Sequence, residues 1–252
     1  MNTPQVSFLP ADILVDGFIS RTFTPEDANY YLMLLLRAPV GHYFLQYYGI
    51  SYQNGGWYIT QNAGVIQQPL PGIGASTLLL DCTIRTSLGT VVPQNRWAPS
   101  DEVDIRRHVE GATLQLPVFF VNQMGGVGFW LPDILQGRDR DLYNGNMAAP
   151  LGGRSTTHIR INWPGYVSWR RQIPTRDETR DRKPITLARF MKHIGTSVDR
   201  FFKDCAAGGH MPDGPWRIGA DGITHGHVKV IGAVHVSAGS WMPIMQLTEY
   251  VF

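Results

Sequence analysis

The sequence is short of cysteine, of charged residues and of long apolar runs, and each shortage excludes a class of protein. Two cysteines, Cys82 and Cys205, among 252 residues exclude a disulfide framework, so reduced thiols in a cytoplasmic protein are expected. Charged residues make up 17% and hydrophobic residues 43%, the reverse of the balance in a disordered chain. The longest apolar run, residues 30–36, is far shorter than the ~20 residues of a membrane-spanning helix, so no membrane partner is expected.

The chain also lacks a strong charge of either sign and a secretory signal. Its formal net charge of +2 is too small to indicate a nucleic-acid-binding protein. Residues 1–17 contain no lysine or arginine, and prolines and aspartates interrupt their apolar residues, so a signal peptide is not expected. These absences favour a globular cytoplasmic protein and argue against nucleic acid as its partner.

Glycine and proline, by contrast, are abundant. The 27 glycines and 17 prolines exceed average usage, which is typical of a loop-rich protein with many turns. Five apolar runs predict strands, at residues 77–84, 113–121, 127–131, 227–236 and 242–251. Pro117 lies within the second run and restricts it to an edge or bulged strand, because proline cannot donate a hydrogen bond to a sheet.

Two alternating runs in the second half predict a β-hairpin. Polar and apolar side chains alternate over residues 158–163 and 167–170, and the turn dipeptide Pro164-Gly165 lies between the two runs. Because side chains alternate between the faces of a strand, Arg160 and Arg170 are expected on its polar face.

Two segments carry helical signals. Thr24 is a capping residue, Pro25 suits the first helical turn, and the helix is expected over residues 25–37. Residues 185–206 place eight apolar side chains on one stripe, interpreted as core packing: Leu187, Phe190, Met191, Ile194, Val198, Phe201, Phe202 and Cys205. The sequence thus predicts an α+β fold, with a mainly antiparallel β-sheet and two principal helices (about 25–37 and 185–206), in a single domain over residues 1–252.

Three histidines near the C-terminus are candidate metal ligands. His225, His227 and His235 would share one face of a strand, and neutral imidazoles bind Zn, Cu or Fe. However, His235 would lie about 26 Å from the other two along a straight strand, and no glutamate follows at the interval of cupin sites. We therefore expect no metal, and His225 and His227 are kept only as candidates for an enzyme alternative.

Local motifs of nucleophilic or nucleotide-binding enzymes do not occur. The sequence has no Gly-x-Ser-x-Gly elbow, and its glycine-rich segments at 72–74 and 125–128 lack the ending of a P-loop. Cys205 lies on the helical stripe, where an inert buried thiol is expected, and Cys82 lies in a predicted strand. No metal or nucleotide cofactor is predicted. An enzyme with a dispersed hydrolytic or histidine–metal site stays as an alternative.

Residues 151–210 are the basic part of the chain. They contain 12 lysines and arginines against 5 acidic residues. Trp163, Tyr166 and Trp169 interleave with the arginines, as on proteins that bind single-stranded nucleic acids. An interaction protein using this surface is therefore a second alternative. The simpler interpretation is a solvated back of the long helix, formed by Arg189, Lys192, Arg200 and Lys203.

Four segments of the second half resemble uncharacterised proteins of mushroom-forming (basidiomycete) fungi. They are residues 151–166, 171–179, 184–190 and 236–244. Among fungal proteins, the chain is similar to the pink chromoproteins of oyster mushrooms. The resemblance implies a non-enzymatic protein that holds a small organic chromophore, and it assigns no pigment contact to a numbered residue.

The function expected from the sequence is a pigment-binding chromoprotein, a non-enzymatic small-molecule-binding protein that holds an aromatic or conjugated ligand. Seven tryptophans and an aromatic share of 11% suit such a site. The candidate ligand-binding residues are Trp163, Tyr166, Trp169 and Cys82. Non-covalent binding is expected, because Cys205 is expected in the core and Cys82 has only Arg85 as a basic neighbour. A homo-oligomer, such as a dimer, is left open.

Overall fold

The computed structural model describes six parts of the chain, residues 17–36, 50–53, 55–60, 77–84, 89–209 and 212–248. Two predicted element ends lie outside these parts: the last residue of the helix expected over 25–37, and the end of the strand expected over 242–251.

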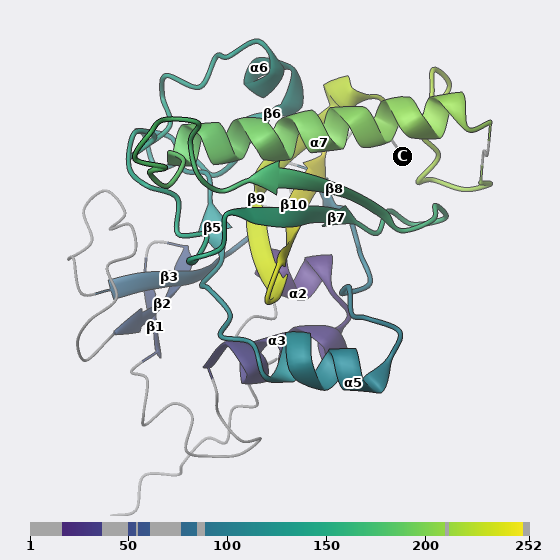
Figure 1. Ribbon diagram of the computed structural model, residues 1–252. Helices are drawn as coiled ribbons and strands as arrows, with labels where there is room; N and C mark the ends of the chain where they lie inside the picture. Colours follow the sequence, from purple (N-terminus) through teal and green to yellow (C-terminus); the bar gives the residue numbers. More distant parts are fainter. Residues whose placement is uncertain are drawn as a thin grey trace, which may run out of the picture.

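A seven-stranded sheet occupies the centre of the molecule (Figure 1). Its main path has the order β5-β9-β10-β7-β8, while β4 pairs with β10 and β6 with β9. The strands are β4 (Thr90–Val91), β5 (Val118–Phe119), β6 (Phe129–Trp130), β7 (Thr156–Ile161), β8 (Trp169–Pro174), β9 (Val228–Ser237) and β10 (Ser240–Leu247). Among the described strands, β7 and β10 are the one parallel pair of this sheet, and its other pairs are antiparallel.

Pro243 lies inside β10, where proline is normally disfavoured because it lacks an N–H group. On one side of β10, β7 pairs with residues 240–241 and β4 with residues 246–247, so the described strands leave a gap beside Pro243. The side-chain amide of Gln94 fills part of this gap and donates to the Pro243 carbonyl at 2.7 Å. A side chain thus supplies the hydrogen bond that a neighbouring strand would otherwise provide.

A separate three-stranded antiparallel sheet is formed by β1 (Ile50–Gln53), β2 (Gly56–Thr60) and β3 (Thr77–Cys82). Strand β3 confirms the strand predicted for residues 77–84. The helices are α2 (Phe18–Thr22), α3 (Pro25–Leu36), α5 (Glu102–Ile105), the π-helix η2 (Arg106–Glu110), α6 (Leu131–Leu135), α7 (Leu187–Ala207) and the 3-10 helix η3 (His225–His227).

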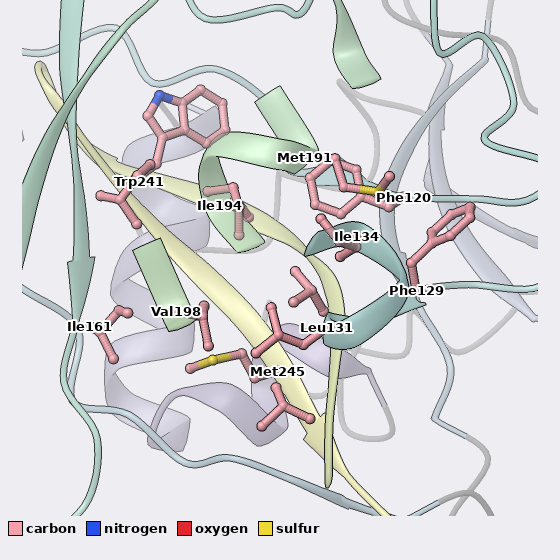
Figure 2. Packing of buried hydrophobic residues seen from close by; sticks show 14 of the residues in the cluster. Phe120, Phe129, Leu131, Ile134, Ile161, Met191, Ile194, Val198, Trp241 and Met245 are labelled. Carbon is pink, nitrogen blue, oxygen red and sulfur yellow. The ribbon is translucent and has the colours of Figure 1, made fainter. Parts of the chain in front are cut away.

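The central sheet has a core on each face (Figure 1). Helix α7 covers one face, and α2 and α3 lie on the other. Figure 2 shows the α7 core, where Ile194 and Val198 point toward Trp241 and Met245 of β10. The next residue after Trp241, Met242, belongs instead to the α2–α3 core. Strand β10 is buried throughout because both faces of the sheet are covered.

The α+β class predicted from the sequence is confirmed, and its finer description holds in part. Seven of the eight residues of the α7 stripe are buried as predicted, and Thr186 accepts from the backbone N–H of Arg189 to begin the helix. The expectation of a buried Cys205 is wrong, because Cys205 lies near the end of the helix and is only half-buried against the core. The run predicted as a strand over 113–121 forms only Val118–Phe119, directly after Pro117. The run over 127–131 forms only Phe129–Trp130, because Leu131 begins α6. The single-domain organisation stays a prediction.

Candidate functional site

A cleft of about 590 Å³ lies where three segments distant in sequence meet. One wall is the junction between α2 and α3, the second is the segment 93–95, and the third is the turn between β7 and β8. The lining residues are Thr22, Phe23, Thr24, Pro93, Gln94, Asn95, Asn162, Trp163, Pro164, Gly165, Tyr166 and Ser168.

The β7–β8 turn has the conformation that its sequence predicts. The backbone N–H of Tyr166 donates to the carbonyl of Trp163 at 3.1 Å, which closes the turn around Pro164 and Gly165. Gly165 has a φ of +81°, and a Cβ atom there would lie 2.9 Å from the Pro212 Cβ atom. Both the backbone conformation and the close approach require glycine at this position.

Two of the candidate aromatic residues, Trp163 and Tyr166, line this cleft. Trp163 is buried, and its indole N–H donates to the carbonyl of Trp216 at 2.8 Å. The Tyr166 hydroxyl accepts from the backbone N–H of Ile218 at 2.9 Å. Both rings also pack against Phe201 of α7, with centroids 6.1 Å away in each case. The rings are therefore held in fixed positions by the core behind them.

The third candidate ring, Trp169, is not among the lining residues of this cleft. Its indole N–H donates to the Asp204 carboxylate at 2.8 Å, and its ring contacts Phe201 at a centroid distance of 6.1 Å. Trp169 therefore joins β8 to α7, which is a structural role. The prediction that it binds the ligand together with Trp163 and Tyr166 finds no support in this arrangement.

A hydrogen-bond network joins the three walls of the cleft. The backbone N–H of Gln94 donates to the carbonyl of Thr22 at 2.6 Å. The Gln94 side-chain carbonyl accepts from the backbone N–H of Asn162 at 3.1 Å, and the Asn162 side-chain amide donates to the carbonyl of Asn95 at 2.7 Å. These bonds fix the orientation of the Asn162 amide group and leave its oxygen as an acceptor.

Two oxygen atoms of the lining residues are buried without a hydrogen-bond partner among the described residues. They are the hydroxyl oxygen of Thr22 and the side-chain carbonyl oxygen of Asn162. A buried polar group without a partner costs about 1–3 kcal/mol. Two such groups in the walls of one cleft mark a place where a bound molecule could supply hydrogen bonds.

Cys82 lies in a different, smaller pocket of about 350 Å³. Its thiol is buried, and the burial together with the nearby Asp81 carboxyl raises the pKa of Cys82 well above its ordinary value. The thiol is therefore protonated at neutral pH, which makes it a poor nucleophile. Cys82 does not belong to the cleft that contains Trp163 and Tyr166.

The histidine arrangement expected from the sequence is wrong. His225 and His227 lie on the 3-10 helix η3 and not on a strand, and the imidazole of His227 accepts from the backbone N–H of Thr224 to complete a capping box. His235 is buried in β9, where it stacks on Trp241 at 4.7 Å. Burial and the charge of Arg154 lower the pKa of His235 to about 4. Within the described residues, no group of three or more His, Cys, Asp or Glu side chains is arranged to bind a metal ion.

Three of the four basic residues that were expected on the solvated back of the long helix are exposed there, and the fourth is not. Arg189, Arg200 and Lys203 are exposed on α7, as expected. Lys192 is instead half-buried, and its amine donates to the carbonyl of Ile134 at 2.9 Å and to the carbonyl of Leu135. It therefore binds the end of α6 and is not part of a solvated back of the helix.

Arg160 and Arg170 face each other across the β7–β8 pair, as the hairpin predicts. The guanidinium of Arg160 stacks over the Trp97 ring at 3.4 Å and donates to the Ser240 hydroxyl at 2.9 Å. Burial and the neighbouring charge of Arg170 lower the pKa of Arg160 to about 10. Within the described part of the chain, no carboxylate forms an ion pair with either arginine.

The chain matches no protein-family model, no curated protein and no solved structure. In the part of the chain that the structure describes, no helix is long and apolar enough to cross a membrane. The function is therefore inferred from the geometry of the chain itself.

Sequence reasoning missed most of the polar wall of the cleft. Thr22, Gln94 and Asn162 have no local motif, because each acquires its role through contacts with residues far away in sequence. Tyr166 could be expected to face a cavity, since it directly follows a Pro-Gly turn in a polar strand connection. No comparable local sequence signal indicates a role for Gln94.

Proposed function

We propose that the protein is a non-enzymatic binding protein that holds an aromatic or conjugated small molecule in the cleft between α2, the segment 93–95 and the β7–β8 turn. The observation that carries the proposal is the combination of aromatic residues and two unpartnered oxygen atoms, those of Thr22 and Asn162, in the lining of one cleft. Small-molecule sites are usually apolar clefts with a few placed polar groups.

The size and lining of the cleft support an aromatic ligand. A volume of about 590 Å³ lies within the usual range of about 300–1,000 Å³ for small-molecule sites. Tyr166 is half-buried and offers a ring contact, while Phe23 and Trp163 are nearly fully buried and contribute apolar atoms to the walls. The Asn162 oxygen accepts hydrogen bonds, so the ligand that fits best carries an N–H or O–H donor. Both unpartnered oxygens are covered by neighbouring protein atoms, so the proposal requires the groups that cover them to shift when a ligand binds, while the hydrogen bond to Asn95 holds the Asn162 amide in place.

The more specific part of the proposal is that the ligand is a pigment. The resemblance of the second half of the chain to fungal proteins supports a cytoplasmic chromoprotein whose chromophore is bound non-covalently. The protonated state of the Cys82 thiol agrees with non-covalent binding, since a thiolate is the form that attacks a ligand.

Substitution of Thr22 by Val tests the site with a defined probe, 7-hydroxycoumarin, whose hydroxyl is the donor that the proposal pairs with the Thr22 oxygen. The change preserves side-chain shape and removes one hydrogen bond, so 7-hydroxycoumarin should bind about five- to tenfold more weakly, as measured by fluorescence titration. Coumarin, which lacks the hydroxyl, should bind both proteins equally.

Thr157→Val is the matched control for this experiment. The Thr157 hydroxyl is also buried without a partner among the described residues, but Thr157 does not line the cleft. Its substitution should leave the affinity for 7-hydroxycoumarin unchanged. Equal weakening by both substitutions, or no saturable binding of either coumarin to the unchanged protein, would contradict the proposed site.

A second candidate function, binding of a polyanion, is favoured by the pairing of Arg160 with Arg170. Like charges directly opposite on two strands destabilise a sheet, and a bound anion would offset this repulsion. We expect weak binding to heparin that falls steeply with salt, because anion binding releases counterions. Arg170→Gln should weaken it, while Arg200→Gln, on exposed α7, should have a smaller effect. Sub-micromolar binding that persists at high salt would favour this function over small-molecule binding.

A further inference from the structure

The chain contains only four lysines, Lys183, Lys192, Lys203 and Lys229, and three of their amines have partners. The Lys183 amine lies 3.8 Å from the Asp181 carboxylate, and that of Lys203 lies 2.7 Å from the Asp199 carboxylate. The Lys192 amine donates to two backbone carbonyls at the end of α6. Among the described residues, Lys229 is the one lysine whose amine has neither an ion pair nor a hydrogen bond.

Lys229 lines the pocket of about 350 Å³ that also contains Cys82. The other lining residues among those that the structure describes are Phe18, Gly55, Thr83, Asn122, Met124, Gly125, Gly126, Val127 and Gln246, and none of these is charged. The pocket is therefore large enough for a small organic molecule and has uncharged hydrogen-bonding groups around a single amine. It is separate from the cleft that contains Trp163 and Tyr166.

The sheet and a glycine hold the Lys229 side chain in this pocket. The Cα register places Lys229 of β9 opposite Gln246 of β10 on one side and Trp130 of β6 on the other. A Cβ atom at Gly128 would lie 3.1 Å from the Lys229 Cε atom and 2.6 Å from the Ile231 Cδ1 atom. The aliphatic part of Lys229 therefore packs on the bare backbone of Gly128, which also has a positive φ of +85°.

Burial in the pocket shifts the pKa values of Lys229 and Cys82 in opposite directions. Burial lowers the pKa of Lys229, so a larger fraction of this amine is neutral at a given pH. Burial and Asp81 raise the pKa of Cys82, so its thiol is kept in the unreactive protonated form. The amine is consequently the group in this pocket that can attack an electrophile. Half-buried lysines without a counter-ion are suited to imine formation.

We propose that this pocket is a second binding site, independent of the ligand cleft, which captures a small aldehyde as an imine on Lys229. The neutral Lys229 amine adds to the aldehyde carbon, which forms a new C–N bond and a carbinolamine. Loss of the carbonyl oxygen as water, together with the two amine protons, then gives the C=N bond. No oxidant or reductant is needed, and hydrolysis releases the aldehyde again.

Reductive trapping tests the proposal on the full chain. The protein is incubated at neutral pH with benzaldehyde and cyanoborohydride, which reduces an imine to a stable secondary amine, and the four lysines are followed by peptide mass spectrometry. Lys229 should be benzylated several times faster than Lys183, because burial leaves a larger fraction of its amine neutral and because the pocket holds the aldehyde beside it. Lys183 serves as the exposed reference within the same molecule.

Two variants keep the test independent of folding. Lys229→Arg retains the positive charge and cannot form an imine, so rapid labelling should disappear while the thermal unfolding midpoint stays close to that of the parent. Cys82→Ser should leave the labelling rate of Lys229 unchanged. Labelling of Lys229 no faster than that of Lys183 would overturn the proposal. Saturable protection of Lys229 by benzoate, with no benzaldehyde adduct, would also overturn it and would indicate a carboxylate-binding site.

Discussion

Asp81 is a buried carboxyl group that joins two elements and makes stability depend on pH. Its side chain is inaccessible to solvent, and its carboxyl group accepts from the backbone N–H of Ile19 at 3.1 Å and of Cys82 at 2.8 Å. The first of these bonds joins β3 to the start of α2. Burial raises the pKa of Asp81 to about 8, even though the backbone donors favour the charged form.

The raised pKa of Asp81 predicts the sign of the pH dependence of stability. Between its ordinary pKa of 3.8 and the folded value of about 8, the folded protein binds a proton that the unfolded chain has released. The free energy of unfolding contributed by Asp81 is therefore fully present in acid and falls as pH rises through this window. His235, whose pKa is lowered to about 4, gives a slope of the opposite sign between pH 4 and its ordinary value of 6.5, so the Asp81 contribution is measured as a difference between proteins that share His235. Urea titrations from pH 4 to pH 8 should show that the stability of the unchanged protein, relative to that of the Asp81→Asn variant, falls as pH rises.

Asp81→Asn should flatten this dependence, because the amide keeps an acceptor oxygen and does not titrate. Asp177→Asn is the control, since the pKa of the exposed Asp177 is lowered by the Thr179 hydroxyl and its titration lies below this window. An equal slope in the unchanged protein and in the Asp81→Asn variant would show that Asp81 is charged in the folded protein.

Among the elements, α7 could be predicted from sequence with nearly correct bounds, and the β7–β8 hairpin with its turn, although its second strand was predicted over 167–170 and lies over Trp169–Pro174. Their signals are local: an apolar stripe at helical spacing in one case, and alternation around Pro164-Gly165 in the other. The short strands β5 and β6 were predicted too long, since Pro117 and the start of α6 limit them. The expectation that His225, His227 and His235 share one face of a strand is wrong, because residues 225–227 form a turn of 3-10 helix that strand alternation does not anticipate.

The contact between α7 and α6 leads to a prediction about two lysines on the same helix. Lys192→Met should lower the free energy of unfolding by about 1–2 kcal/mol, because it removes the amine that donates to the carbonyls of Ile134 and Leu135 at the end of α6. Chemical denaturation measures the change.

Lys203→Met is the matched control on α7. It removes an exposed ion pair with Asp199, and such pairs contribute less than about 1 kcal/mol. Lys192→Met should therefore lower the free energy of unfolding more than Lys203→Met does. A loss at Lys203 that equals or exceeds the loss at Lys192 would show that the Lys192 amine does not stabilise α6.

For the molecule as a whole, the cleft proposed as the ligand site lies where the two cores meet. Phe23 belongs to the core of α2 and α3, and Trp163 belongs to the core under α7. Gln94 joins these parts through bonds to Thr22, Asn162 and Pro243, the last 149 residues away. Such long-range contacts explain why the polar wall of the cleft could not be found from local sequence patterns.

This position predicts that a ligand in the cleft stabilises both cores together. A molecule that binds only the folded protein raises the free energy of unfolding in proportion to the logarithm of its concentration above Kd. Protein that carries its natural ligand should therefore unfold at a higher temperature than ligand-free protein, in one transition.

The absorption spectrum and native mass of protein purified from its natural source test the central claim most directly. The account predicts absorption beyond the ~280 nm band of tryptophan and tyrosine, and a mass above that of the chain. Both should be lost on denaturation, because the ligand is held non-covalently and the cleft no longer excludes water. A bare chain with only tryptophan and tyrosine absorption would contradict the account, and so would a ligand that stays on the chain after denaturation.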